Sequence, residues 1–294
     1  MEPPRFAMNT VQRHLIWKCR DRTVELGAST LVMGILNVTP DSFSDGGRFS
    51  RADQAVEQAL RMVEAGASII DIGGESTRPG AAPVSTEEEL ARVIPVIRAL
   101  AGRIDRLISV DTRKAAVAEQ ALGLGAHIIN DVSALTHDPA MAAVAQKFGA
   151  GIVLMHMKGE PGTMQKDPRY EQVVTDVVEF LASRIRDLVA RGLARETMAV
   201  DPGIGFGKTL EHNLELIARL EKLAELGRPI VMGLSRKSFL GKITGREVHD
   251  RLAGSLAAAA YAVTRGANII RVHDVKESCD VVRVVDMLRR EERE

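Results

Sequence analysis

The sequence has few cysteines and no excess of either charge. Two cysteines, Cys19 and Cys279, cannot form a disulfide framework, and neither stands in a Cys-x-x-Cys spacing or beside a histidine. We therefore expect two unreactive thiols in a reducing, cytoplasmic compartment. The 39 basic and 39 acidic residues cancel, which argues against a general nucleic-acid-binding protein but leaves room for a local anion site.

Long hydrophobic runs are also missing. The N-terminal stretch MEPPRFAMNTVQRHLIWKCRDR lacks the apolar core of a signal peptide. The most apolar later stretch, LAAAAYAV, is too short to span a bilayer, so we expect no membrane partner. By contrast, 45% of the 294 residues are hydrophobic, which is enough for a large core. An α/β barrel can reach about 250 residues as one domain, so this length does not require two.

An internal repeat indicates the architecture. Four times a helical pattern ends at Gly-Ala and an apolar run follows: GASIIDIGG from Gly66, GAHIINDVS from Gly125, GAGIVLMHM from Gly149 and GANIIRVHD from Gly266. Glycine suits the left-handed position that follows a helix. The continuous Ile/Val runs are typical of strands that are buried on both faces.

Four further apolar runs bring the expected strands to eight: LVMGILN, RLISVD, MAVDPG and PIVMGLS. Helical patterns lie at about 53–65, 86–100, 114–124, 139–148, 170–192, 213–226, 248–265 and 277–290. This alternation predicts an α/β protein with a (β/α)8 TIM barrel at about 31–290, preceded by a β-hairpin at about 13–27, in one domain over 1–294. The alternative is an open doubly wound sheet. That fold usually has a glycine-rich fingerprint after its first strand, where this sequence has the long polar loop NVTPDSFSDGG.

Polar residues follow the expected strands. In barrels of this kind the active site forms at the carboxyl ends of the strands, so these residues should converge on one pocket. Asp111, Asn130 and Asp201 offer carboxylate and amide groups, with Lys237 nearby. Such a set suits the N–H edge of a planar heterocycle, to which a carboxylate makes charge-assisted hydrogen bonds. The alternative is that these residues cap the helices that follow, Asp111 above all.

The end of the last expected strand suggests an anion site. Arg271 and His273 are two residues apart, so their side chains face the same side, and together they suit a phosphate or pyrophosphate. The alternative is a pair between Arg271 and Asp274 that holds the rim of the barrel. The sequence shows no zinc-type cluster. Asn37 and the acidic residues after it are oxygen donors, which suit Mg²⁺ held mostly by substrate phosphates and water.

Two motifs have less direct interpretations. GIGFGK departs from both glycine patterns of nucleotide-binding loops. We interpret its glycines as letting the backbone pass close to a flat ligand, with Phe206 available to stack. His156, flanked by Met155 and Met157, could be a base or a ligand. We expect instead a hydrogen-bonded residue in the wall of the pocket.

Taken together, these segments resemble the dihydropteroate synthases. The motifs NVTPDSFSDGG, ESTRPGA, SVDTRK, INDVSA, LMHM, DPGIGFGK, GLSRKSF and RVHDV occur in the order and spacing of that family, from about Leu31 to the C-terminus. The resemblance implies a transferase of folate biosynthesis that joins p-aminobenzoate to hydroxymethyl-dihydropterin pyrophosphate, giving dihydropteroate and pyrophosphate. It also implies Mg²⁺ as cofactor, a homodimer, and a target of sulfonamides.

The same resemblance implies roles for individual residues. For the pterin ring they are Asp111, Asn130, Met157, Asp201, Phe206, Gly233 and Lys237. For the pyrophosphate they are Thr77, Arg271 and His273, and for Mg²⁺ Asn37. For p-aminobenzoate and the loops around it they are Asp41, Phe43, Asp45, Arg78, Pro79 and Ser238. In this interpretation the long loop after the first strand is a lid that keeps water out of the site.

Two other functions stay open. A methyltetrahydrofolate-dependent methyltransferase shares a pterin-holding barrel, but it has no pyrophosphate leaving group and usually works with a cobalamin module. A pterin-binding paralogue could have lost catalysis, although the intact motifs of the first two loops argue against it.

Overall fold

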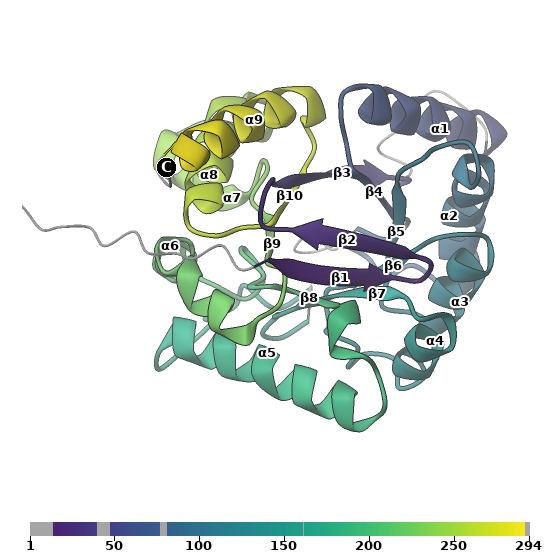
Figure 1. The fold of residues 1–294 in the computed structure, drawn as a ribbon, viewed down its shortest axis with the longest axis horizontal. Helices are drawn as coiled ribbons and strands as arrows, with labels where there is room; N and C mark the ends of the chain where they lie inside the picture. Colours follow the sequence, from purple (N-terminus) through teal and green to yellow (C-terminus); the bar gives the residue numbers. More distant parts are fainter. Residues whose placement is uncertain (1–13, 40–47, 77–80, 161, 292–294) are drawn as a thin grey trace, which may run out of the picture.

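The fold is a barrel of eight parallel strands surrounded by helices, as the sequence predicts (Figure 1). The computed structural model describes residues 14–39, 48–76, 81–160 and 162–291, without the side chains of 48–50. The strands follow one another in the order β8-β7-β6-β5-β4-β3-β10-β9. A parallel bridge between Val200 and Ile230 joins the two ends of this sheet, which brings the barrel close to full closure.

The barrel strands are β3 (Leu31–Asn37), β4 (Ile69–Gly73), β5 (Leu107–Asp111), β6 (Ile128–Asp131), β7 (Gly151–Met155), β8 (Met198–Asp201), β9 (Val231–Gly233) and β10 (Ile269–Val272). The helices are α1 (Arg48–Glu64), α2 (Thr86–Leu100), α3 (Ala115–Gly123), α4 (Met141–Phe148), α5 (Val173–Ala190), α6 (Leu210–Ala218), α7 (Ser238–Thr244), α8 (Leu252–Thr264) and α9 (Val275–Glu291). Short 3₁₀ segments cover Arg195–Thr197, Leu220–Leu226 and Val248–Asp250.

Two of the helix predictions were wrong in part, and one helix was missed. The helix expected at 213–226 ends at Ala218, and its second half is a 3₁₀ segment. The helix expected at 248–265 likewise begins with a 3₁₀ turn, and α8 proper starts at Leu252. The helix α7 was not predicted, because it has only seven residues and ends at a left-handed Gly245, so it lacks a full amphipathic repeat.

The predicted hairpin closes the N-terminal end of the barrel. It consists of β1 (Leu15–Cys19) paired with β2 (Arg22–Leu26), and it lies in front of the barrel in Figure 1. Trp17 is fully buried, and its indole N–H donates to the carbonyl of Thr197 over 2.8 Å. The hairpin packs on one apolar layer inside the barrel, formed by Met33, Ile69, Leu107, Ile128, Val153, Ala199, Val231 and Ile269. We call this layer the floor.

Along each strand, successive side chains point alternately toward the surrounding helices and toward the inside of the barrel. Residues such as Ile70 and Ile72 pack outward against the helices in a second, larger cluster. Ile69 belongs to the floor, so Asp71 and Gly73, two and four residues later, also face the inside of the barrel. The inward positions therefore run from an apolar floor at the hairpin end to polar residues at the carboxyl ends.

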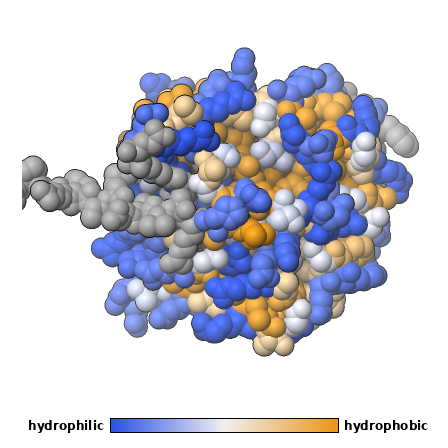
Figure 2. All heavy atoms as spheres, viewed as in Figure 1, coloured by the Kyte–Doolittle hydropathy of each residue, from blue (hydrophilic) through white to orange (hydrophobic). Residues whose placement is uncertain are grey.

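The outer surface agrees with the composition. On the face that carries the hairpin, hydrophilic residues alternate with smaller hydrophobic patches (Figure 2). No helix within the described ranges is both long enough and apolar enough to cross a bilayer. Cys19 and Cys279 are free and buried, and burial raises the pKa of both thiols, in agreement with the expected lack of reactivity.

Candidate active site

A charged network lies directly above the floor. Arg271 of β10 pairs with two carboxylates: its Nε is 2.6 Å from Asp71 Oδ2, and its Nη2 is 2.7 Å from Asp111 Oδ2. Asn130 of β6 donates from Nδ2 to the same Asp71 oxygen over 3.0 Å. Parallel strands thus bring together Asp111, Asn130 and Arg271, as predicted, around a fourth residue that the prediction omitted.

Burial and charge act against each other in this network. Burial raises the pKa of Asp111 to about 7, although Arg271 lowers it, and Asp71 raises it further. Burial alone would lower the pKa of Arg271, but Asp71 and Asp111 together raise it. The guanidinium therefore stays charged, and Asp111 is more easily protonated than a solvent-exposed aspartate.

Asp111 does not cap the helix that follows it. The N-cap position of α3 is Lys114, and no side chain there makes a capping bond. The first helical N–H, of Ala115, donates instead to Asp138 Oδ2 over 2.8 Å. The capping alternative is therefore wrong for Asp111. For Asp201 it is wrong too, because the N-cap of α6 is Thr209.

A second polar group borders the same space from β8, β9 and the start of α7. A Cβ atom built on Gly233 would lie 3.7 Å from Lys237 Nζ and 3.9 Å from Asp201 Oδ2, so all three residues face one small volume. Lys237 Nζ lies 4.8 Å from the ring centroid of Phe206 and donates to the carbonyl of Ile204. Glycine at position 233 places no side chain between the acid and the amine.

Burial disfavours the charged forms of both Asp201 and Lys237. Burial raises the pKa of Asp201, and Lys237 acts in the opposite direction. Burial lowers the pKa of Lys237 to about 8, and Asp201 opposes that shift. Asp201 Oδ1 accepts from the N–H of Gly203 over 2.7 Å. A ligand that donates to the carboxylate and accepts from the amine would relieve both costs.

The glycines of GIGFGK have a different reason from the one expected. Gly203 and Gly207 have left-handed φ angles of +67° and +62°. A Cβ at these positions would collide with the carbonyl oxygens of His156 and Lys158, respectively. The close approach is thus to the chain after β7, and the interpretation as close approach to a flat ligand was wrong for these two. Only Gly205 lies against a predicted site residue, the Lys237 stem.

His156 is buried and hydrogen-bonded, in agreement with that part of the expectation. Its Nδ1 is 2.9 Å from the Nζ of Lys208, a buried lysine that also donates to the carbonyl of Phe206 over 3.0 Å. Burial lowers the pKa of His156 to about 3 and that of Lys208 to about 7. The imidazole is therefore neutral and accepts from the lysine, which ties the chain after β8 to the chain after β7.

Arg271 and His273 have separate partners. His273 Nδ1 lies 3.1 Å from Ser235 Oγ. Asp274 pairs with Arg236, whose Nε donates to Asp274 Oδ2 over 3.1 Å, so the alternative of an Arg271–Asp274 pair was wrong. Ser238 is exposed at the first position of α7.

The remaining predicted residues lie at the rim or outside the described ranges. Asn37 ends β3, beside Gly73 in register, and Met157 follows β7; both are half-buried. Six predicted residues fall outside the described residues: Asp41, Phe43, Asp45, Thr77, Arg78 and Pro79. The predicted lid falls there as well. Within the described part of the chain, no group of three or more His, Cys, Asp or Glu side chains could hold a metal.

Sequence reasoning missed Asp71 and Lys208. The predicted residues stand at or after the carboxyl ends of the strands, whereas Asp71 stands in the middle of one. The available signal was a carboxylate within an apolar run, which is costly to bury unless it is paired. Lys208 was counted as the end of a glycine motif, although a fully buried lysine needs acceptors in the same way.

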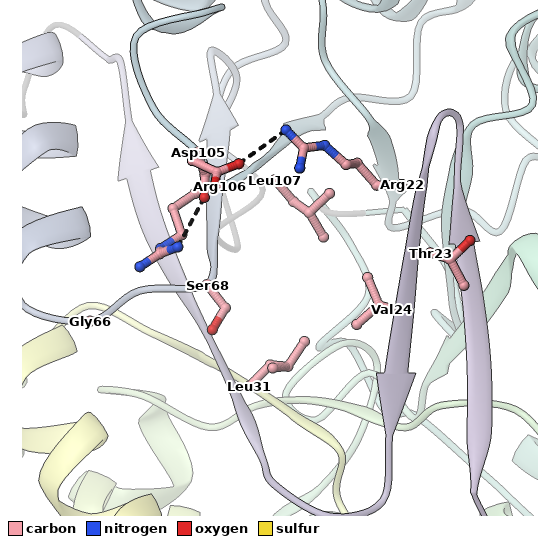
Figure 3. A pocket seen from close by; sticks show the side chains of 9 residues that line it. All are labelled: Arg22, Thr23, Val24, Leu31, Gly66, Ser68, Asp105, Arg106 and Leu107. Atoms are coloured by element: carbon pink, nitrogen blue, oxygen red, sulfur yellow. Dashed lines mark hydrogen bonds and ion pairs between the residues drawn. The ribbon is translucent and has the colours of Figure 1, made fainter.

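A separate cavity lies at the opposite end of the barrel. It has a volume of about 270 Å³, between the hairpin and the first residues of β3 and β5 (Figure 3). Its charged residues pair with each other: Arg22 Nη2 is 3.0 Å from Asp105 Oδ1, and Arg106 donates to the Asp105 carbonyl. In a barrel of this kind, this end serves stability, and the active site belongs at the other.

Comparison with known sequences identifies close relatives. A family model described as "Pterin binding enzyme" matches residues 33–273. The chain is 51% identical over 255 residues to dihydropteroate synthase of Escherichia coli, covering 87% of this chain and 90% of the relative. It is 46% identical over 267 residues to dihydropteroate synthase of Haemophilus influenzae, covering 91% and 95%.

Solved structures agree with these relatives. Dihydropteroate synthase of Yersinia pestis, in a sulfonamide drug complex, superposes with a TM-score of 0.88 at 48% identity, covering 94% of this chain and 99% of that one. The enzyme of Xanthomonas albilineans in complex with 7,8-dihydropteroate gives a TM-score of 0.84 at 42% identity, covering 93% and 98%.

Proposed function

The chain belongs to the family of pterin-binding enzymes, and we propose that it acts there as a dihydropteroate synthase. It then condenses p-aminobenzoate with hydroxymethyl-dihydropterin pyrophosphate to give dihydropteroate and pyrophosphate. The observation that carries the proposal is the paired arrangement of Asp201 and Lys237 across Gly233, next to the network of Arg271. A planar ring with N–H groups on one edge and acceptors on another fits between these charges.

We assign the pterin ring to the groups that face this space. The Asp201 carboxylate accepts from the ring N–H groups, and Lys237 donates to the ring acceptors. Asn130 and Asp111 serve the opposite edge, and Phe206 and Met157 lie along the ring. Each charge-assisted bond of this kind contributes roughly 1.5–3 kcal/mol. Gly233 keeps the volume open.

The anion is assigned to the last strand. Arg271 and His273, with Thr77, bind the pyrophosphate and stabilise the negative charge that develops as it leaves. The reaction breaks the bond between the methylene carbon and the pyrophosphate oxygen and forms a bond between that carbon and the amine of p-aminobenzoate. The amine loses one proton. Since the electron-rich dihydropterin supports the positive charge at the methylene, no protein nucleophile is required.

The residues present fit Mg²⁺ as a cofactor. Asn37 offers an amide oxygen at the carboxyl end of β3, and the described residues hold no cluster of further ligands. Mg²⁺ commonly binds through one or two protein oxygens and takes its other ligands from phosphates and water. Bound beside Asn37, it would neutralise charge on the pyrophosphate.

Several further properties follow from the family resemblance. We propose that p-aminobenzoate, and sulfonamides in competition with it, bind near Ser238 and the loop residues Asp41, Phe43, Asp45, Arg78 and Pro79. We also propose that the whole chain is one domain that forms a homodimer. The two free cysteines support a reducing, cytoplasmic location.

The decisive test is pyrophosphate release. The purified protein is incubated with hydroxymethyl-dihydropterin pyrophosphate, p-aminobenzoate and Mg²⁺, and pyrophosphate is followed in a coupled assay. Release that depends on both p-aminobenzoate and Mg²⁺ is expected. Tight pterin binding without release would point instead to a catalytically inactive paralogue. Transfer of a methyl group from methyltetrahydrofolate would indicate that the protein is a methyltransferase.

A further inference from the structure

We propose that Asp71 is a positioning residue of the pterin site, which fixes the orientations of Arg271 and Asn130. The inference rests on the proposed function, because it assigns a role within that same site. Asp71 lies in the middle of β4 and is fully buried. It faces the inside of the barrel, between Ile69 in the floor and the open end, and nothing in the family resemblance above assigns it a role.

The hydrogen bonds of Asp71 go to site residues. Its Oδ2 accepts from Arg271 Nε over 2.6 Å and from Asn130 Nδ2 over 3.0 Å. Asp131, at the end of β6, is equally buried but behaves differently. It accepts from the N–H and hydroxyl of Ser133, over 2.7 and 2.6 Å, and from the N–H of Leu135 over 3.2 Å. Asp131 therefore holds its own turn, whereas Asp71 holds the ligand-facing side chains.

Stability does not explain a carboxylate at this position. A buried ion pair is a weak source of stability, because desolvation offsets most of the attraction, and apolar replacements are often neutral or better. Moreover, Asp71 Oδ1 is buried without a hydrogen-bond partner among the described residues, as is the hydroxyl of Ser109, its register neighbour on β5. The scaffold leaves Asp71 only half satisfied, which is a cost that a structural role would not require.

Orientation does explain it. A carboxylate only accepts, so Asn130 must turn its NH₂ toward Asp71 and its amide oxygen away. That oxygen is then a fixed acceptor for a ring N–H. In the same way, Asp71 occupies the Nε edge of Arg271, so the guanidinium takes only Oδ2 of Asp111. The other Asp111 oxygen is left for the ring.

The test compares Asp71→Asn with the matched control Asp131→Asn. Binding of 6-hydroxymethylpterin is measured by calorimetry, kcat and KM are measured in the pyrophosphate-release assay, and Tm is measured for each variant. Asp71→Asn should weaken pterin binding and lower kcat/KM by about tenfold or more. Because removing one charge of a buried ion pair also destabilises a fold, binding and activity are measured below the Tm of each variant. Asp131→Asn should lower Tm and leave the pterin Kd within about twofold of wild type.

A double-variant cycle tests the route of the effect. If Asp71 acts through Asn130, adding Asp71→Asn to Asn130→Ala should weaken pterin binding less than Asp71→Asn alone does. Additive effects would show that Asn130 is not on the route and would overturn that part. Unchanged pterin affinity and kcat/KM in Asp71→Asn would overturn the whole proposal. If Asp71→Asn fails to fold, the smaller Asp71→Ser is judged by the same criteria.

Failure of the proposed function has a different signature. In that case the wild-type protein itself neither binds 6-hydroxymethylpterin nor releases pyrophosphate, and the positioning role is overturned together with the proposed function. Binding by wild type without an Asp71 effect, by contrast, refutes only the positioning role.

Discussion

Replacing Asp201 with asparagine should weaken ligand binding and, at the same time, remove the unfavourable burial of a carboxylate charge. The variant keeps the shape of the side chain and an oxygen that can accept from the N–H of Gly203. At the Oδ2 position, which lies beside Lys237 and Gly233, it presents an NH₂ donor instead of a charged acceptor. A pterin N–H would then face a donor.

The expected magnitude follows from one lost charge-assisted bond. Such a bond contributes roughly 1.5–3 kcal/mol, which corresponds to a 10- to 150-fold weaker affinity. Calorimetry with 6-hydroxymethylpterin measures it directly. The control is Asp286→Asn, at the other end of the barrel, where the carboxylate accepts from the N–H and the hydroxyl of Thr30 over 2.7 and 2.9 Å. That variant should lose stability and keep its pterin affinity.

Stability should change in the opposite direction, and its pH dependence gives the sign. Burial raises the pKa of Asp201, so its contribution to stability is fully present below the unfolded pKa and is lost as the pH rises through the folded pKa. Asparagine does not titrate. The free energy of unfolding of Asp201→Asn should therefore increase relative to that of wild type as the pH rises through this range. Unchanged pterin affinity in the variant would refute the reasoning and leave Asp201 as a residue that only shapes its loop.

Three further predictions use the same assays. Gly233→Ala should fold normally, since its Cβ would make ordinary contacts at 3.7 and 3.9 Å. The added methyl group should weaken pterin binding roughly 10- to 200-fold by filling the space beside Asp201 and Lys237. An unchanged pterin affinity would show that the ring binds elsewhere. Because burial lowers the pKa of Lys237 to about 8, pterin affinity should fall as the pH rises through that value, and Lys237→Gln should remove this dependence. Phe43→Ala and Asp45→Ala should each lower kcat/KM for p-aminobenzoate; if neither does, the lid hypothesis is wrong.

The sequence was sufficient for the order of the fold because each strand carries a local signal. A Gly-Ala pair followed by Ile and Val marks four strands, and each of them lies in the barrel. Elements without a full repeat were less visible: α7 is too short, and the region after Leu220 continues as a 3₁₀ segment. Convergence of residues at the strand ends was predictable too, because barrel topology alone brings those ends together.

The pairing of individual atoms was not predictable. Arg271 was expected to face an anion, and its Nε and Nη2 donate to Asp71 and Asp111, which lie 200 and 160 positions away along the chain. No local pattern encodes such a choice. The glycines at 203 and 207 show the same limit, because the atoms that exclude a Cβ there belong to the chain after β7.

The inside of the barrel also explains why a hairpin far from the chemistry matters to it. Trp17 and the floor fill the N-terminal end with buried apolar side chains, which lie directly below Asp71. Above this apolar layer, the buried carboxylates and cations interact in a lower dielectric than in water, where charge-assisted bonds are stronger and unpaired charges are more costly. That cost is visible in the raised pKa of Asp111 and the lowered pKa of Lys237. The desolvation that disfavours these charges is therefore the same property that lets a few side chains bind a polar ring tightly. A substitution that disrupts the packing of the floor should accordingly weaken pterin binding without any change in the residues that touch the ring.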